Sequence, residues 1–329
     1  MDETGYKIRP YLDSDFEAEA RIDGEVDPKH AATAKEIRRW DELLRIEPDR
    51  VYFKLAAENL ETKETVAYGS LTQPSFNYDP RWFWVWVEVA PAHREKGIGA
   101  GLYDRLEREA RSRGGLGMWG TAREGDGVGM PFLERRGFQV LQKVWLSRLD
   151  LAAMDLSNVP DRSGGLGREG VRFTTLGEEG ATVPGVRRSI HRLSEAAGKD
   201  SPRVGRRHPF SYEEFVAMDL EGPGSMPEGM FLAWKGTELV GVSALHRDLA
   251  RPDTLRIGFT GTHPGFRGQG IGTELKRRGA VFARQRGYRY LVTGNNSENR
   301  PILAINRRFG FVPETVWVHS EKRLDDQPT

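Results

Sequence analysis

The stretch Val89-Ala-Pro-Ala-His-Arg94-Glu-Lys-Gly97-Ile-Gly99 joins two segments of different pattern. Residues 82–89 before it are strongly apolar and aromatic, which is typical of a buried strand. After it, Leu102, Leu106 and Ala110 recur at helical spacing. The Arg-x-x-Gly-x-Gly turn therefore lies where a strand gives way to a helix.

The same turn occurs a second time, as Arg267-Gly-Gln-Gly270-Ile-Gly272, at an offset of 173 residues (267 − 94). Ala110-Arg-Ser-Arg-Gly114 returns as Ala283-Arg-Gln-Arg-Gly287 at that offset, and Gly137-Phe138 returns as Gly310-Phe311. A repeat this long is a duplicated domain rather than a solenoid unit.

A polar, glycine-rich stretch without strand or helix periodicity separates the copies. We predict an N-terminal domain over 1–156, a linker over 157–169 and a C-terminal domain over 170–329. Each copy shows the same series of strands and helices and ends on a strand, at 138–149 and at 311–319. The predicted class is mixed α/β (α+β): a mostly antiparallel sheet with helices on both faces.

The glycine turns indicate binding of a pyrophosphate. The first N–H groups of a helix lack internal partners and lie at the positive end of its dipole. Glycine lets a phosphate approach the backbone, and an arginine adds a charged donor. A Rossmann fingerprint would need a third glycine where Leu102 and Leu275 stand, and neither copy has the Gly-Lys-Ser/Thr of a P-loop. The alternative is a tight turn that binds nothing.

Composition excludes several classes of protein. The 329 residues hold 49 Lys+Arg and 48 Asp+Glu, a formal charge of +1, which does not favour a nucleic-acid binder. With no cysteine, disulfides, thiolate metal sites and a cysteine nucleophile are absent, and we predict no metal site. No apolar run spans a membrane and the start lacks a secretory signal, so we expect a cytoplasmic monomer or homodimer without membrane partners.

Both turns resemble the coenzyme A signature of the GNAT (N-acetyltransferase) superfamily. The second copy, Thr262-His-Pro-Gly-Phe-Arg267-Gly-Gln-Gly270-Ile-Gly272, has threonine where valine is usual. Asn299 with Asn306-Arg-Arg-Phe-Gly310-Phe311 resembles the second family signature, as does Leu133-Glu-Arg-Arg-Gly137-Phe138 in the first copy. The layout resembles that of tandem, double-domain members.

The resemblance implies transfer of an acetyl group from acetyl-CoA to a primary amine, on a small molecule or a peptide, by direct attack in a ternary complex. The motif strand would diverge from its neighbour, and its backbone would pair with the pantetheine arm and support the oxyanion. In the first copy the implied coenzyme ligands are Val87, Val89, Arg94, Glu95, Lys96, Gly97, Ile98, Gly99 and Ala100. In the second copy they are Thr260, Thr262, Arg267, Gly268, Gln269, Gly270, Ile271, Gly272, Thr273, Asn299 and Asn306.

The tyrosine that protonates the leaving thiolate in many members of the family is missing. Leu133 and Asn306 hold its place, and of these only Asn306 can contact the sulfur. The second copy keeps Asn299, where the first has Asp126. These residues favour the C-terminal domain as the catalytic half. The alternative function is a non-catalytic acyl-CoA-binding or sensing protein.

The general base stays open at this stage. Glu88 on the first motif strand is a candidate, but Gly261 replaces it in the second copy. His246 and His263 lie nearby in that copy, and a lone histidine is more often structural. Two other groups of residues have both a structural and a functional interpretation. The basic group is either a solvated loop or part of an acceptor pocket; it consists of Arg203, Arg206, Arg207 and His208. The aromatic group either packs in the core or lines a pocket; it consists of Trp82, Phe83, Trp84 and Trp86.

Overall fold

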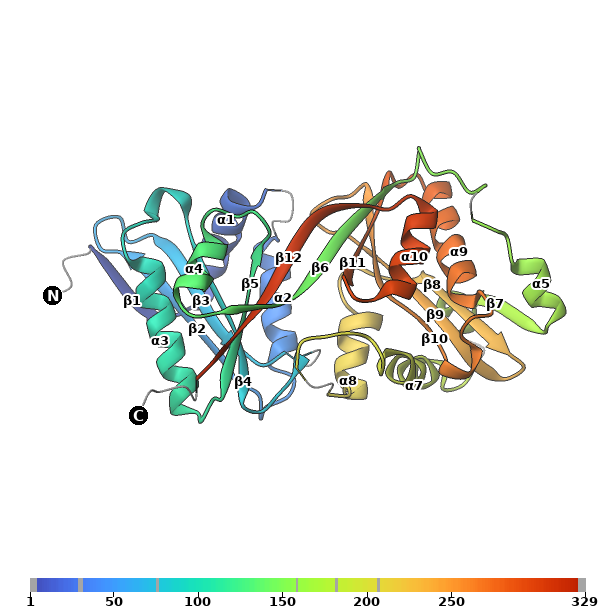
Figure 1. The fold of residues 1–329 in the computed structure, drawn as a ribbon, viewed down its shortest axis with the longest axis horizontal. Coiled ribbons are helices and arrows are strands. Elements are labelled where there is room, and N and C mark those ends of the chain that lie inside the picture. Colours follow the sequence, from blue (N-terminus) through green and yellow to red (C-terminus); the bar gives the residue numbers. More distant parts are fainter. Residues whose placement is uncertain are drawn as a thin grey trace. The chain divides into compact units, whose positions relative to one another are not determined.

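A computed structural model describes residues 5–28, 32–74, 77–157, 159–180, 183–205 and 208–324. The chain forms two compact units of mixed α/β structure (Figure 1). Of the described residues, unit 1 takes those up to Gln142, those between 204 and 208, and those from Val318 on. Unit 2 takes 143–203 and 209–317. No helix in these described stretches is long and apolar enough to cross a membrane.

Unit 1 is built on a sheet in the order β1-β2-β3-β4-β5, antiparallel except for the parallel pair β4–β5. Successive side chains of a strand point to opposite faces. On β3, Ala67 therefore packs in the core that includes Leu102 of α3, whereas Tyr68 packs with Ile22 of α1. The elements are β1 (Tyr6–Pro10), α1 (Phe16–Val26), α2 (Ala34–Leu44), β2 (Tyr52–Asn59), β3 (Thr65–Thr72), β4 (Trp82–Val89), α3 (Ile98–Ser112), β5 (Gly117–Arg123) and α4 (Gly129–Arg135).

Unit 2 repeats this plan in the order β6-β11-β10-β9-β8-β7, with β10–β11 as its parallel pair. On β8, Ala233 packs in the core with Leu275 of α9, and Leu232 packs with Ile190 of α7, so helices cover both faces. The elements are α5 (Ser163–Arg168), β7 (Val171–Thr175), α6 (Leu176–Glu179), α7 (Val186–Gly198), α8 (Tyr212–Phe215), β8 (Ser225–Lys235), β9 (Glu238–Arg247), β10 (Thr254–Thr262), α9 (Ile271–Gln285), β11 (Tyr290–Asn296) and α10 (Arg300–Phe309).

The closing strands, β6 (Gln139–Asp150) and β12 (Val312–Arg323), each pass from one unit into the other. Within unit 2, residues 144–150 of β6 pair antiparallel with β11. Within unit 1, the N–H of Leu324 donates to Leu116 O at 2.8 Å, directly after β12. Both strands were expected, but each copy of the repeat lends its closing strand to the other unit. Periodicity identifies a strand and leaves its pairing partner open.

The segment predicted as a linker packs on unit 2. Val159 and Leu166 are buried in the core that holds Leu275, and α5 lies within the segment. The apolar residues of this stretch are too few to produce a periodic signal, so their burial was not foreseen. The domain boundaries at 156 and 170 stay a prediction.

The end of β12 is held in unit 1 by a partly buried carboxylate, that of Glu107. Lys322 Nζ lies 2.6 Å from a carboxylate oxygen of Glu107 and 3.1 Å from the hydroxyl of Tyr103. Burial would raise the pKa of Glu107, but hydrogen bonds from Lys322, Arg111 and Tyr103 outweigh it and lower the pKa to about 2.

We expect Glu107 to stabilise the fold above pH 4.5 and to lose this contribution as the pH falls towards 2, because its pKa is lowered on folding. The loss is on the order of 2 kcal/mol in the free energy of unfolding. Urea unfolding at pH 5 and pH 2 measures it. Glu107→Gln should remove this part of the pH dependence and the exposed Glu61→Gln should not; equal behaviour of the two variants would contradict the assignment.

Candidate active site

The parallel pair of unit 2 separates partway along its length. β10 and β11 pair at four positions, from Thr254 with Tyr290 to Ile257 with Thr293. Beyond these positions both strands continue, and a cavity of about 770 Å³ has residues 258–262 of β10 and 294–295 of β11 in its walls. The divergence that the family resemblance implied is therefore present in unit 2, and it coincides with a cavity of ligand size.

The corresponding pair in unit 1 also separates early. β4 and β5 pair from Trp82 with Gly117 to Trp84 with Trp119, and β4 then runs on to Val89. The aromatic run here is largely packing: Phe83 is in the core and Trp82 stacks on Trp119 with 5.1 Å between ring centroids.

The two motif strands differ in register. β4 pairs with β3 without interruption from Trp84 to Val89. On β10, Ile257 pairs with Leu245 and Thr260 with Ser243, so three steps on β10 match two on β9. This is a β-bulge, which leaves an extra residue unpaired and turns its backbone out of the ladder. Because the bulge adjoins the cavity wall, it frees backbone groups at the opening in unit 2.

The two glycine turns, Arg94–Gly99 and Arg267–Gly272, are called the first and the second cradle. The second cradle has the features of a pyrophosphate site. α9, a helix of 15 residues, begins directly after Gly270, whose φ of 90° is in the left-handed region that favours glycine. A Cβ added at this position would overlap the side chain of Arg162. Arg267 forms an ion pair with Asp200 at 2.6 Å and donates to Ala197 O at 3.2 Å. Two guanidinium groups and a free helix N-terminus thus fit a diphosphate.

The first cradle has the same backbone with different contacts. Gly97 precedes α3 with φ 77°, and Glu95 holds a φ of 62° where the second copy has Gly268 at 79°. Arg94 donates from Nε to Val89 O at 3.1 Å and lies 3.5 Å from Glu88. This arginine therefore also holds the turn against its own strand.

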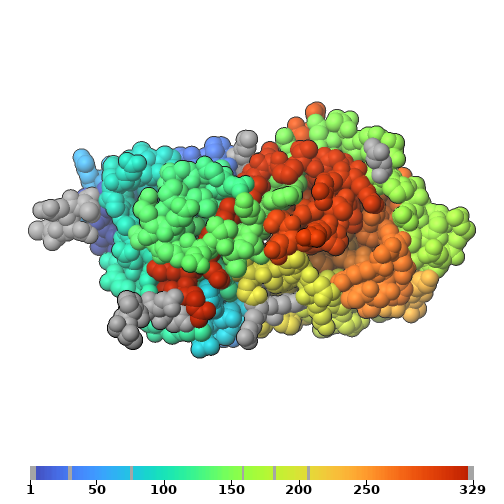
Figure 2. Space-filling view, viewed as in Figure 1, coloured from blue at the N-terminus to red at the C-terminus, as the bar shows by residue number. Residues whose placement is uncertain are grey.

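Most of the predicted coenzyme residues of the second copy line one cavity, but Gln269 and Asn306 are not in its wall. Its wall includes Thr260, Thr262, Arg267, Gly268, Gly270, Ile271, Gly272, Thr273 and Asn299. Asn299 also caps α10, accepting from Ile302 N at 3.4 Å. In unit 1, Gly99 lies against Val87 and Val89. Figure 2 shows that the orange surface of unit 2, with residues near 270, borders the red surface with residues near 305.

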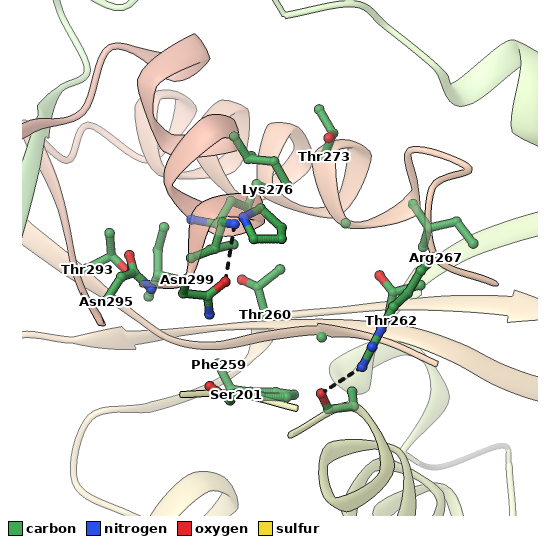
Figure 3. A pocket seen from close by; sticks show the side chains of 18 of the residues that line it. Ser201, Phe259, Thr260, Thr262, Arg267, Thr273, Lys276, Thr293, Asn295 and Asn299 are labelled. Atoms are coloured by element: carbon green, nitrogen blue, oxygen red, sulfur yellow. Dashed lines mark hydrogen bonds between the residues drawn. The ribbon is translucent and has the colours of Figure 1, made fainter. Parts of the chain in front are cut away.

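Polar side chains form a connected group at the cavity of unit 2, in which Lys276, Thr293 and Asn295 line the wall and Asn306 is buried next to them. Lys276 Nζ donates to Asn306 Oδ1 at 2.5 Å, and Asn306 Nδ2 donates to Asn295 Oδ1 at 2.7 Å. Thr293 Oγ1 lies 3.5 Å from the same Asn295 oxygen. In Figure 3, Lys276, Thr293, Asn295 and Asn299 lie on the α9 and α10 side of β10, whereas Phe259 and Ser201 lie on the other side. Lys276 was not among the residues predicted from the sequence, because its position in an amphipathic helix gives no chemical signal.

Carboxylates and histidines near the motif strands differ between the units. Burial raises the pKa of Glu88 in unit 1 to about 7, although Arg94 opposes the shift. In unit 2, the ring of His246 lies over Gly258, 2.8 Å from the place of an added Cβ, and 3.9 Å from Asp219. Burial, with a contribution from Arg256, lowers the pKa of His246, and burial raises that of Asp219 to about 6.

Other candidates have structural contacts. His263 accepts at Nδ1 from Gly265 N at 3.3 Å and so holds the turn before the cradle. Arg203 donates to Gly198 O at 3.0 Å. The ring of His208 packs edge-to-face against that of Tyr78 in unit 1. Arg206 and Arg207 lie outside the described residues, so the interpretation of this cluster as an acceptor pocket stays a prediction.

Comparison with known proteins agrees with this geometry. The model of the acetyltransferase (GNAT) family matches residues 12–138 and 192–311. A mycothiol acetyltransferase of Catenulispora acidiphila is 25% identical over 240 residues, 70% of each chain. That of Thermobifida fusca is 28% identical, over 68% of this chain and 70% of its own.

Two solved structures share the fold. A tandem GNAT protein from the clavulanic acid biosynthesis pathway has a TM-score of 0.75 at 18% identity, covering 98% of this chain and 100% of its own. A GCN5-related N-acetyltransferase from Sphaerobacter thermophilus has a TM-score of 0.70 at 20% identity, covering 98% and 96%.

A split parallel pair followed by a glycine turn at a helix N-terminus fits a protein that binds a phosphate-bearing coenzyme. The chain belongs to the GNAT acetyltransferase family, which matches it in both halves. It is an acetyl-CoA-dependent acetyltransferase. The tandem, double-domain layout expected from the sequence is confirmed and is like that of mycothiol synthase. Members of this family generally use acetyl-CoA as co-substrate.

We expect wild type to bind two equivalents of acetyl-CoA, one at each cradle. Gly97→Glu and Gly270→Glu form a matched pair, because each puts a negative charge at the N-terminus of a motif helix. Calorimetric titration should find one equivalent left in each variant, with melting curves as the control for folding. A wild type that binds one equivalent, lost only in Gly270→Glu, would show that the first cradle is empty of coenzyme.

Proposed function

We propose that unit 2 transfers an acetyl group from acetyl-CoA to a primary amine by direct attack in a ternary complex. The observation that carries the proposal is the cavity at the β10–β11 split, which the cradle, the β-bulge and the Lys276–Asn306 pair all adjoin. Unit 1 has a regular motif strand and carries Leu133 in the place of Asn306.

Residues of unit 2 would hold the co-substrate along the split. Arg162, Arg267 and the first N–H groups of α9 would bind the pyrophosphate, and the backbone of residues 260–262 would pair with the pantetheine arm. When bound, the co-substrate supplies an activated acetyl thioester. Backbone N–H groups freed at the bulge would polarise its carbonyl.

The amine would enter from the side of β10 that carries Phe259 and Ser201, opposite Lys276 (Figure 3). His246 would take the proton from the attacking ammonium through a water molecule, because its lowered pKa keeps the ring neutral near pH 7. Asp219, 3.9 Å away, would stabilise the imidazolium that forms. Glu88 stays the corresponding candidate in unit 1.

Turnover tests the proposal directly. We expect thiol release from acetyl-CoA with at least one member of a panel of primary amines. The panel includes the acceptor of mycothiol acetyltransferases, because the curated relatives carry that name. Gly270→Glu should abolish the release and Gly97→Glu should retain it. Tight coenzyme binding without turnover across the panel would instead favour an acyl-CoA-binding or sensing protein.

The base assignment predicts a pH dependence. A histidine that acts as a base is active when neutral, so kcat/KM should fall as the pH drops through the lowered pKa of His246, below its ordinary value of 6.5. His246→Gln should lower kcat/KM by about 100-fold or more and remove this acid limb. His263→Gln, in the turn, serves as the control. An unchanged acid limb in His246→Gln would place the base elsewhere.

A further inference from the structure

Lys276 is an amine buried at the wall of the cavity. It lies on α9, one helical turn after Gly272 of the cradle, and only 3% of the residue is exposed. Its single recorded hydrogen bond, among the described residues, goes to Asn306 Oδ1 at 2.5 Å, and Nζ lies 5.3 Å from the ring centre of Phe311. A lysine with such partners is costly to bury as a structural cation, because no carboxylate compensates the lost hydration.

The carboxylates near the cavity that have salt bridges pair with arginines and not with Lys276. Asp200 pairs with Arg267, and the buried Glu274 on α9 pairs with Arg278 at 3.0 Å. Within the described ranges no salt bridge joins Lys276 to a carboxylate. Burial without a counter-ion lowers the pKa of Lys276 to about 7, so near neutral pH both of its protonation states are accessible. The charged residues that line the same cavity are Arg162, Asp200, Arg267, Glu298 and Arg308.

The amide of Asn306 fixes the position of the amine. Its Nδ2 donates to Asn295, so its Oδ1 must face Lys276. In the first copy, the positions 173 residues earlier hold Tyr103 and Leu133. The Tyr103 hydroxyl contacts Lys322, and Leu133 is apolar core, so this polar pair is specific to unit 2.

We propose that Lys276 is the proton donor to the sulfur of the departing coenzyme A, held in place by Asn306. The proposal rests on acetyl transfer in unit 2 and assigns the acid of that reaction, a role that the sequence left without a residue. Lys276 lies on the α9 and α10 side of the β10–β11 split, across β10 from the proposed entry of the amine, and Asn306 is its hydrogen-bond partner on α10.

The reaction balances with this assignment. The lone pair of the neutral amine forms the C–N bond to the acetyl carbon, and the C–S bond breaks with its electron pair left on sulfur. The sulfur takes one proton from the Lys276 ammonium, which becomes a neutral amine. The attacking nitrogen is cationic once the C–N bond has formed, and it becomes a neutral amide by giving up one proton, which passes through water to Lys276 and restores the ammonium. The proton that His246 took from the acceptor before the attack is released to solvent.

Lys276→Met, which keeps the length of the side chain and removes the proton, is the main variant. We expect coenzyme affinity within about threefold of wild type, kcat reduced by about 100-fold or more, and loss of the decline in kcat above pH 7. Lys276→Arg keeps the charge without a titratable proton and should not restore that decline. Lys7→Met, at an exposed position of unit 1, is the control. Unchanged kcat, or a loss of affinity that matches the loss of activity, would overturn the proposal.

A second measurement needs no acceptor and no turnover. The thiol pKa of bound coenzyme A can be followed by thiolate absorbance during a pH titration of the complex. A neighbouring ammonium lowers the pKa of a thiol from its ordinary value of about 8.5. Wild type should therefore show thiolate absorbance at a lower pH than Lys276→Met, because the thiolate and the Lys276 ammonium stabilise each other and titrate as a coupled pair.

The two measurements separate two kinds of failure. Equal thiol pKa values in wild type and Lys276→Met would show that Lys276 does not contact the sulfur, and would overturn the proposal even in an active enzyme. A lowered thiol pKa in wild type without turnover on any amine would refute acetyl transfer while leaving the contact in place. Melting curves of Lys276→Met, with and without coenzyme A, exclude misfolding as the cause.

Discussion

The early end of the parallel pairing between β10 and β11 is the constraint on which the site depends. Four residue pairs hold the strands together, and after Ile257 and Thr293 their backbone groups need other partners. The bulge on β10 begins at the same position. The strand therefore separates from β11 and also has a residue whose backbone groups are not paired with β9. A ligand with an extended amide chain can meet these groups, and α9 with its cradle follows immediately along the chain.

Much of this arrangement was readable from the sequence because it depends on local signals. A repeat at one offset, glycines required by a left-handed backbone at Gly97 and Gly270, and strand-to-helix transitions predicted the two units and their cradles. The pairing of β6 with β11 could not be predicted, because the backbone of a strand can pair with any sheet edge whose faces match its side-chain pattern. Lys276 escaped for another reason: only the tertiary contacts with Asn306 and Phe311 distinguish it from a lysine on a solvated helix face.

The two copies agree in the backbone conformation of the cradle and the strand split and differ in their side chains. Both keep the glycine turn and the split of the parallel pair, which depend on backbone conformation. They differ where side chains act. Tyr103 and Leu133 complete a core in unit 1, and Lys276 and Asn306 at the same places form a polar pair in unit 2. A hydrogen-bonded pair beside a cavity costs burial of polar atoms, which apolar packing avoids.

The exchange of closing strands has a consequence for synthesis of the chain. Residues 318–324, which complete unit 1, follow all of unit 2 in the sequence. A ribosome therefore releases the first hundred and forty or so residues with a sheet edge at β5 that stays open until the second unit has been made. An uncovered edge strand is prone to pair with other chains. The N-terminal half expressed alone lacks its last strand, so its sheet keeps an open edge at β5.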